Sequence, residues 1–321
     1  MTAQLPLKSL QLDNHIPAGQ ALAAAQAAEA AGITRVWLTE DLFHRGALPL
    51  AGAILASTTT LQVGVGVVAA QLRHPAALAM DVRSLLDLGP GRFTLGLGAG
   101  VAERARHLMQ PASPPLRLVR EAIEQVRTLL AGGTLEQGGL LHSAERLALS
   151  GQPPAGGPCP LYAAAIGPQA LAQAGRLADG VVLTAMCAVE HVRHAAGLVQ
   201  AAAAAAGRPP IPVVAYVPVL MLDDAAAAKA AMRRVLAGYV ADWAGLAFLS
   251  RLFTEWSPLT PESMDAIGQA LRAGDEATLA ELLPDEVLDA YTIAGDLPEC
   301  RRLAARLAAA GATELALSHE A

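Results

Sequence analysis

The sequence predicts an α/β fold, a closed (β/α)8 TIM barrel that forms one domain. Segments rich in β-branched residues or leucine alternate with alanine-rich amphipathic segments, which is the pattern of parallel strands joined by helices. Eight strand segments occur along the chain, and an open doubly wound sheet usually has fewer. The length of 321 residues suits one barrel of about 250 residues with insertions.

Each element is placed by its composition and by the residues that flank it. Several helices are expected to begin with proline, whose missing N–H has no partner to lose in the first turn. The expected helices cover residues 20–31, 49–58, 75–88, 116–131, 168–177 and 189–205. The expected strands cover residues 8–12, 35–39, 61–68, 93–97, 161–165, 180–184, 211–220 and 313–318.

Two regions depart from the repeat. Residues 132–160 are rich in glycine and proline and are expected to form a loop or hairpin insertion. Residues 223–290 have the pattern of several consecutive helices. We expect both to be insertions into the barrel rather than separate domains. No room is left after residue 318 for a final outer helix, so part of residues 223–310 is expected to replace it.

Composition excludes several classes of protein. The net charge is −6 without a run of Lys or Arg, so we expect no nucleic-acid partner. Apolar stretches are interrupted before the roughly 20 residues that a membrane span needs, and the N-terminus lacks the pattern of a signal peptide. A cytoplasmic enzyme acting on a small molecule is expected, with a homodimer as the candidate assembly. Cys159, Cys187 and Cys300 lack the spacing of a zinc site, so we expect reduced, packed thiols and no metal.

Five segments in order resemble the luciferase-like monooxygenase superfamily. Residues 28–100 contain AEAAGITRVWLTEDLF, LQVGVGVV and RHPAALAMDVRSLLDLGPGRFTLGLGAG. PLYAAAIGPQALAQAGRLADGVVL and IAGDLPECRRLAARLAAAGATELALS follow at residues 160–183 and 293–318. The sequence is most similar to the deazaflavin-dependent branch that includes the methylenetetrahydromethanopterin reductases. The resemblance implies a luciferase-like barrel that binds the deazaflavin F420, with FMN as the alternative.

The candidate catalytic residues follow the first two strands, since the active site of such a barrel lies at the carboxyl ends of its strands. The resemblance implies an acidic residue near the cofactor ring at Glu40 and Asp41. A carboxyl group beside an apolar ring favours its neutral form, so Glu40 is expected to act as a general acid, or else to bind a neighbouring loop. His15 could exchange a proton, or close a backbone hydrogen bond. His74 before Pro75 is expected to cap a helix or order its loop.

The candidate cofactor-binding residues combine small side chains with a helix start. Gly98, Ala99 and Gly100 would let the backbone approach a flat ring, or would simply form a tight turn. Ile166, Gly167 and Pro168 open a helix whose free N–H groups could hold the cofactor's phosphate, with help from Arg193.

The resemblance adds a third group of residues around the third strand. It implies a non-prolyl cis peptide between Gly66 and Val67, behind the ring. The sequence departs from the family just beyond, where Ala69, Ala70 and Gln71 replace an Asn-Pro-Tyr-like segment.

Three functions are compatible with these residues. The first is F420-dependent hydride transfer to or from a small organic substrate, without metal or oxygen. The second is an FMN-dependent monooxygenase. The third is a catalytically silent cofactor-binding barrel, suggested by the small residues at Ala69 and Ala70.

Overall fold

The computed structural model describes residues 7–105, 107, 114–139, 144–154 and 156–319. In this part of the chain the sheet order is β10-β9-β11-β1-β2-β3-β4-β7-β8, and β9 also pairs with β8. Eight strands of the described residues, all but the edge strand β10 in that sheet, therefore close into a barrel. The predicted (β/α)8 fold is confirmed.

Two compact units make up the chain. The N-terminal unit comprises Lys8–Val182 and Leu198–Pro212, and the C-terminal unit comprises the segments Leu183–Gly197 and Val213–Ala321 with the first residues of the chain. The helix α7 (Val189–Ala205) belongs to both. The sequence analysis expected a single domain, which stays a prediction.

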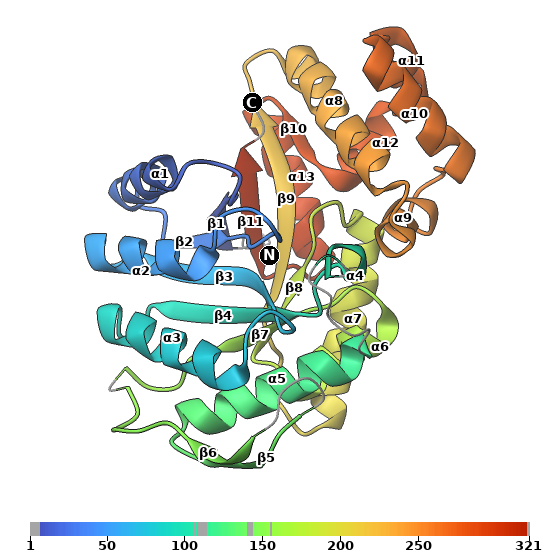
Figure 1. Ribbon diagram of the computed structural model, residues 1–321. Helices are drawn as coiled ribbons and strands as arrows, with labels where there is room; N and C mark the ends of the chain where they lie inside the picture. Colours follow the sequence, from blue (N-terminus) through green and yellow to red (C-terminus); the bar gives the residue numbers. More distant parts are fainter. Residues whose placement is uncertain (1–6, 106, 108–113, 140–143, 155, 320–321) are drawn as a thin grey trace. The chain divides into compact units, whose positions relative to one another are not determined.

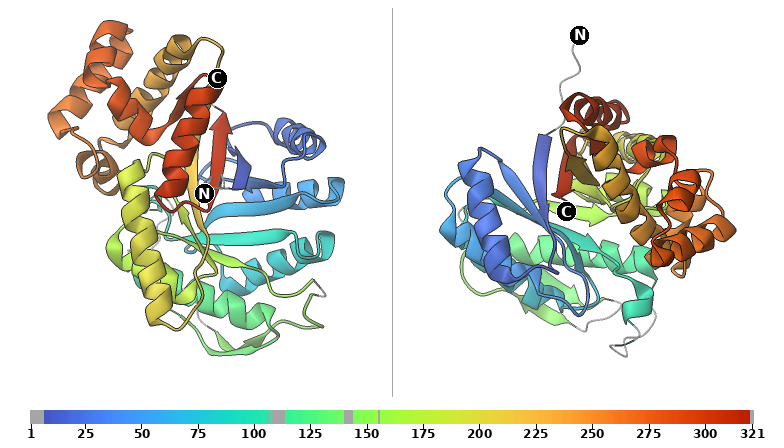
Figure 2. Two further views of the ribbon diagram at one scale, coloured as in Figure 1. Left: turned by 180° about the vertical axis from the view of Figure 1, so that it is seen from behind. Right: turned by 90° about the horizontal axis from the view of Figure 1, so that it is seen from above.

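The N-terminal unit contains parallel strands covered by helices, and the helices α1 to α3 lie on the outer side of β1 to β4 (Figure 1; Figure 2). Its strands are β1 (Leu7–Leu12), β2 (Arg35–Leu38), β3 (Gln62–Ala69), β4 (Phe93–Gly98), β7 (Leu161–Ala164) and β8 (Gly180–Leu183). Its helices are α1 (Ala18–Ala30), α2 (Ala47–Ser57), α3 (Pro75–Leu88), α4 (Ala102–Ala105), α5 (Pro115–Leu130) and α6 (Pro168–Leu177).

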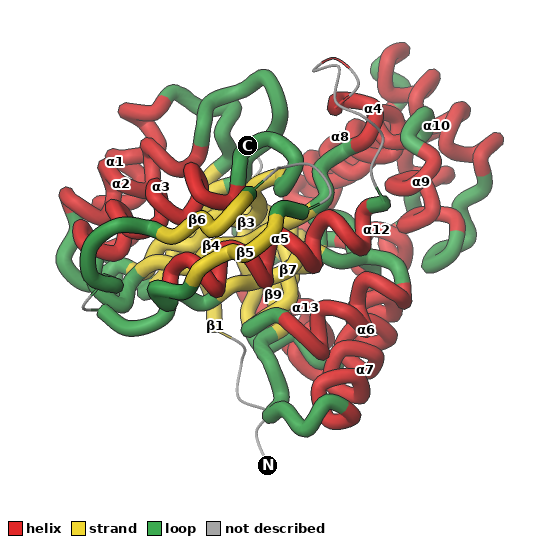
Figure 3. Tube along the Cα trace, turned by 60° about the horizontal axis from the view of Figure 1, so that its bottom comes forward, coloured by secondary structure: helices red, strands yellow, loops and turns green. Residues whose placement is uncertain are grey.

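The insertion at residues 132–160 contains an antiparallel pair, β5 (Thr134–Gln137) and β6 (Glu145–Ala148). This pair lies beside α5 (Figure 3).

The core of the N-terminal unit is aliphatic, with a few rings seated on glycines. Trp37 is fully buried, and a Cβ at Gly64 would lie 2.4 Å from its ring. The Trp37 and Tyr162 rings are 5.7 Å apart, and a Cβ at Gly180 would lie 2.4 Å from the Tyr162 ring. Each large ring therefore occupies space that a glycine on the neighbouring strand leaves free.

The C-terminal unit contains consecutive helices and three strands. Its helices are α8 (Ala225–Trp243), α9 (Ala247–Thr254), α10 (Pro261–Ala273), α11 (Glu276–Leu282), α12 (Asp285–Tyr291) and α13 (Leu297–Ala309). Its strands are β9 (Val213–Met221), β10 (Ile293–Gly295) and β11 (Glu314–His319). Helices α8 to α12 enclose a core around Phe253 and Tyr291, whose hydroxyl donates to the Leu252 carbonyl at 3.1 Å.

The predicted elements agree closely with the structure. Helices α3, α6 and α7 have the expected bounds, and the ends of the predicted barrel strands differ by one or two residues. The helices expected at residues 223–290 are present, and β10 was not predicted. Among the described residues no helix is long and apolar enough to cross a bilayer.

The three cysteines are free and buried, as predicted. Burial raises the pKa of the Cys159 thiol to about 12 and also raises that of Cys187. These thiols therefore stay protonated and unreactive near neutral pH.

Candidate functional site

The candidate residues lie where parallel strands of the N-terminal unit end. β1, β2, β3, β4 and β7 run in the same direction, so their carboxyl ends meet at one edge. Glu40 follows β2, Gly98 ends β4 and Gly167 follows β7. The sequence prediction that these three residues share one edge of the barrel is thus confirmed.

Glu40 is held in a two-point ion pair. Its Oε1 accepts from Arg73 Nη1 at 2.6 Å and its Oε2 accepts from Arg73 Nη2 at 3.0 Å. Oε2 also accepts from the Ala47 backbone N–H at 2.9 Å, at the start of α2. The Glu40 side chain is only 5 % exposed. Bidentate contacts of this kind are charge-assisted and fix the orientation of both side chains.

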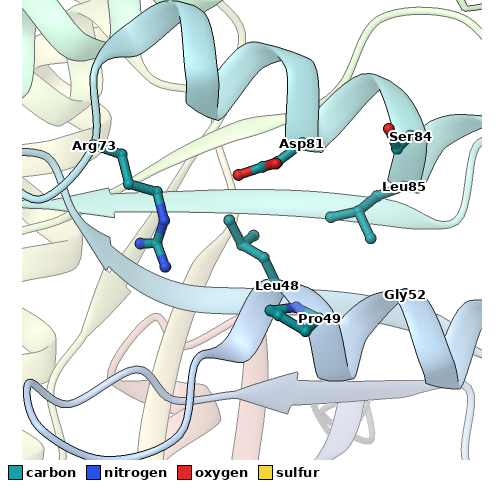
Figure 4. Close-up of a pocket in the computed structure, with 7 residues that line it drawn as sticks. All are labelled: Leu48, Pro49, Gly52, Arg73, Asp81, Ser84 and Leu85. Atoms are coloured by element: carbon teal, nitrogen blue, oxygen red, sulfur yellow. The ribbon is translucent and has the colours of Figure 1, made fainter.

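A cavity of about 290 Å³ lies beside this ion pair, between α2 and α3 (Figure 4). Arg73 points toward it from the loop before α3, and Asp81 and Leu85 face it from α3. Leu48 and Gly52 line it from α2. Glu40 contacts the Arg73 guanidinium just before α3 and the Ala47 N–H at the start of α2. The ion pair therefore connects the starts of the two helices.

Two histidines and two carboxylates gather after β1 and β2, and we call them the His15 cluster. His15 stacks on His44 with ring centroids 3.8 Å apart and planes 15° from parallel. His15 Nε2 lies 3.6 Å from Asp13 Oδ1 and 3.8 Å from Asp41 Oδ2. Arg104 Nη1 lies 3.0 Å from Asp41 Oδ1. The His15 side chain is 53 % exposed, so solvent reaches its ring.

The loop between β2 and α2 is fixed to β1. Asn14 is buried, and its Nδ2 donates to the carbonyls of Asp41 at 3.2 Å and Arg45 at 2.9 Å. Arg45 Nη1 donates to the His15 carbonyl at 2.8 Å.

This fixed loop holds Phe43 in the left-handed region, at φ 73°. A positive φ is rare for a bulky residue and points to a functional constraint. Phe43 is 63 % exposed, and its ring meets His107 edge-on.

A small-residue wall, which we define as Ala69, Gly98, Ala99 and Gly100, lies across the end of β3 and β4. The predicted cis peptide between Gly66 and Val67 is present, and the β3–β4 register shifts between Val65 and Val68. A Cβ at Gly98 would lie 2.7 Å from Val67 Cγ2. Val67 therefore takes the space that a side chain at Gly98 would need.

Polar atoms with unused hydrogen-bonding capacity lie at the same edge. The buried Gln71 Nε2 and the buried Asn14 Oδ1 have no hydrogen-bond partner among the described residues. A Cβ at Gly100, which has φ 73°, would lie 3.1 Å from Gln71 Nε2. An unpartnered amide donor next to a small residue suits a flat heterocycle whose edge carries carbonyl groups.

The start of α6 offers free backbone N–H groups. Gly167 caps the helix without a side-chain hydrogen bond, and a Cβ there would meet nothing within 4 Å. Its N–H groups and helix dipole suit an anionic group. Arg193, expected to assist, forms an ion pair with Glu190 on its own helix.

The structure brings together His15 and Asp41, which the sequence named separately, and it adds Asp13 and His44 to them. His74 caps α3 by accepting from Ala76 N at 3.1 Å, as expected. Sequence reasoning missed the Glu40–Arg73 pair and the conformation of Phe43. The His15 cluster could have been predicted, because the loops after the first two parallel strands lie side by side. No neighbouring residue in the sequence predicts the positive φ of Phe43.

The sequence was compared with protein-family models. The model of the luciferase-like monooxygenases matches residues 4–314. The chain belongs to this family. The resemblance inferred from five short segments is thereby confirmed over nearly the whole chain.

The relatives of this chain include reductases and dehydrogenases, some of which are named as F420-dependent. A 5,10-methylenetetrahydromethanopterin reductase from Methanolobus tindarius is 29 % identical over 91 % of this chain and 87 % of its own length. An F420-dependent hydroxymycolic acid dehydrogenase from Mycobacterium tuberculosis is 35 % identical over 68 % of this chain and 64 % of its own. The structure of the F420-dependent reductase from Methanopyrus kandleri has a TM-score of 0.84 at 22 % identity, over 98 % of this chain and 93 % of that one.

Proposed function

We propose that this protein is an F420-dependent oxidoreductase that transfers a hydride between the deazaflavin and a small organic substrate. The observation that carries the proposal is the small-residue wall beside the β3 bulge, with the unpartnered amide nitrogen of Gln71 close to Gly100. Two relatives, matched over 51 % and 68 % of this chain, are named as F420-dependent dehydrogenases. The bound deazaflavin would supply a ring carbon that accepts or gives the hydride.

The residues of this chain would bind and orient the two reactants. Gly66, Val67, Ala69 and the Gly98–Gly100 segment would hold the ring, because backbone and small side chains allow a close approach. Ile166, Gly167 and Pro168 would bring the start of α6 and its first-turn backbone N–H groups near the phosphate tail. His15, Asp41 and Glu40 remain the candidates for proton handling.

The FMN-dependent monooxygenase is the second candidate function. A diketocamphane monooxygenase in complex with FMN has a TM-score of 0.73 at 18 % identity. At this identity the similarity supports only the fold. We favour F420 because a glucose-6-phosphate dehydrogenase and a hydroxymycolic acid dehydrogenase that match by sequence are named as F420-dependent.

Titration of the purified protein with F420 and, separately, with FMN tests the proposal. We expect F420 fluorescence to be quenched with saturation in the micromolar range, and FMN to bind at least about tenfold more weakly, a difference of about 1.4 kcal/mol. Tight FMN binding without F420 binding would favour the monooxygenase. Binding of F420 without turnover across broad substrate trials would favour the silent barrel.

Two further expectations stay predictions. The protein is expected to act in the cytoplasm, and a homodimer is the candidate for its assembly. Size-exclusion chromatography with light scattering measures the oligomeric state directly.

A further inference from the structure

We propose that Asp13, His15 and Asp41 form a binding site for one divalent transition-metal ion of the zinc type. Each side chain offers one ligand atom, and the three atoms all lie within 4.8 Å of one another at the ends of β1 and β2. The sequence analysis expected no metal because the cysteines lack the spacing of a zinc site. This cluster contains no cysteine, so that argument does not apply to it.

The spacing of the ligand atoms suits a tetrahedral ion. His15 Nε2 lies 3.6 Å from Asp13 Oδ1 and 3.8 Å from Asp41 Oδ2. Bonds of about 2.0–2.2 Å at the tetrahedral angle place two ligand atoms of one zinc ion about 3.3–3.6 Å apart. The two observed gaps are too long for hydrogen bonds and close to this ligand spacing. Small side-chain movements would therefore complete the coordination.

The ligand types favour zinc over the alkaline-earth ions. An imidazole nitrogen with two carboxylate oxygens is a common combination for zinc, whereas Mg²⁺ and Ca²⁺ prefer a shell of oxygen atoms. Three protein ligands leave the fourth tetrahedral position open. Water, or an oxygen atom of a bound molecule, would take that position.

The three side chains are already oriented by other contacts. Asp13 Oδ1 accepts from the His15 backbone N–H at 2.8 Å. Asp41 Oδ1 accepts from Arg104 Nη1 at 3.0 Å, so Oδ2 is the atom that faces His15. The stack on His44, with ring centroids 3.8 Å apart, fixes the plane of the His15 ring. Ligands that are held in place lose little conformational entropy when an ion binds.

The backbone that carries the ligands is fixed as well. Asn14, which lies between two of the ligands in the sequence, is 3 % exposed. Its Nδ2 donates to the carbonyls of Asp41 and Arg45. This amide therefore ties the loop with two ligands to the loop with the third. Its buried Oδ1 has no hydrogen-bond partner in the described part of the chain, so the segment also contains an unused acceptor.

The charge of the cluster attracts a cation. Asp13 and Asp41 together carry two negative charges, and the Arg104 guanidinium neutralises one of them. Arg45 contacts the His15 carbonyl rather than a carboxylate. The side chains of His15 and Asp41 are 53 % and 42 % exposed. Because solvent reaches the ligands and screens their charges, we expect micromolar rather than nanomolar affinity.

An ion at this position would inhibit the enzyme. It would occupy the lone pairs of His15 and Asp41, which are two of the candidates for proton handling. This consequence rests on the proposed function, whereas the metal site itself does not.

Calorimetric titration of the full chain, free of any affinity tag and treated with a chelator, tests the site with ZnCl₂ alone. We expect one ion per chain in the micromolar range, and cobalt(II) should give the intense visible absorption of a tetrahedral complex. His15→Ala and Asp41→Asn should each weaken zinc binding at least about tenfold, or about 1.4 kcal/mol. Circular dichroism confirms that each variant is folded.

The matched control is His194→Ala, which removes an exposed histidine on α7 that has Glu190 one turn before it. Its zinc affinity should equal that of the wild type. No zinc binding by the wild type, or equal affinity in wild type and folded His15→Ala, would overturn the inference.

Titration of the same samples with F420 separates this inference from the proposed function. Zinc binding without F420 binding would leave the metal site standing and contradict the proposed function. F420 binding without zinc binding would contradict the metal site alone. If both bind, zinc is expected to lower turnover of the wild type at least about tenfold at saturation, and unchanged turnover would exclude the inhibitory role.

Discussion

The two sides of the candidate site differ in chemistry. After β1 and β2 the residues are charged or titratable, and each is held by several hydrogen bonds or ion pairs. At the ends of β3 and β4, Ala69, Gly98, Ala99 and Gly100 are small, and a Cβ at Gly98 would lie 2.7 Å from Val67 Cγ2. The difference indicates two separate roles. The side with small residues leaves room for a flat ring to approach, and the side with charged residues supplies the groups that can bind or exchange a proton.

The largest effect is expected on the small side. Gly98→Val places a side chain where Val67 Cγ2 lies 2.7 Å from a Cβ, so the β3 bulge must move. We expect F420 affinity to fall about a hundredfold, or about 2.8 kcal/mol. Fluorescence titration measures the loss. Gly197→Ala on α7, where a Cβ meets nothing within 4 Å, is the matched control. Unchanged affinity in Gly98→Val would place the ring elsewhere.

The next prediction concerns Glu40, on the charged side, and distinguishes a role in stability from a role in turnover. Glu40→Gln leaves the Arg73 guanidinium without its counter-charge in a mostly buried setting. We expect a loss of about 2 kcal/mol in the free energy of unfolding, measured by urea denaturation, with little change in turnover. A loss of turnover of about 10²–10⁴ with unchanged stability would instead make Glu40 the acid–base group.

A smaller effect is expected at Phe43. Phe43→Ala removes an exposed ring from the edge of the charged side. We expect KM for an apolar substrate to rise about tenfold, or about 1.4 kcal/mol, with kcat nearly unchanged. Phe248→Ala, which removes another exposed ring on α9, is the control. An equal change in both variants would mean that Phe43 has no specific contact with substrate.

No effect is expected from thiol reagents. Burial raises the pKa of Cys159 to about 12, and neither side of the site contains a cysteine. Native protein should not react with a disulfide reagent such as 5,5′-dithiobis(2-nitrobenzoic acid) and should keep its F420 affinity, whereas unfolded protein should release three thiols. Rapid reaction in the native state would contradict the packing of these thiols.

Sequence reasoning predicted the fold better than the site, for physical reasons. The periodicity that predicts strands and helices depends on residues close together in the sequence. The same holds for Pro75, which marks the start of α3. The cis peptide at Gly66–Val67 followed from resemblance. The Glu40–Arg73 pair joins residues 33 positions apart through side-chain rotamers, and the stack of His15 on His44 depends on the path of a loop. Such contacts are not determined by residue type and spacing alone.

The seating of Trp37 against Gly64 has a consequence for how this sequence can evolve. A side chain at Gly64 would overlap the ring, since its Cβ would lie 2.4 Å away. Replacing Trp37 first opens a cavity, and replacing Gly64 first creates a clash, so each single step passes through a less stable protein. Substitutions at the two positions are therefore expected to be coupled in their effect on stability. In a barrel built largely from alanine, leucine and valine, such ring-and-glycine pairs are the positions where the order of substitutions matters most.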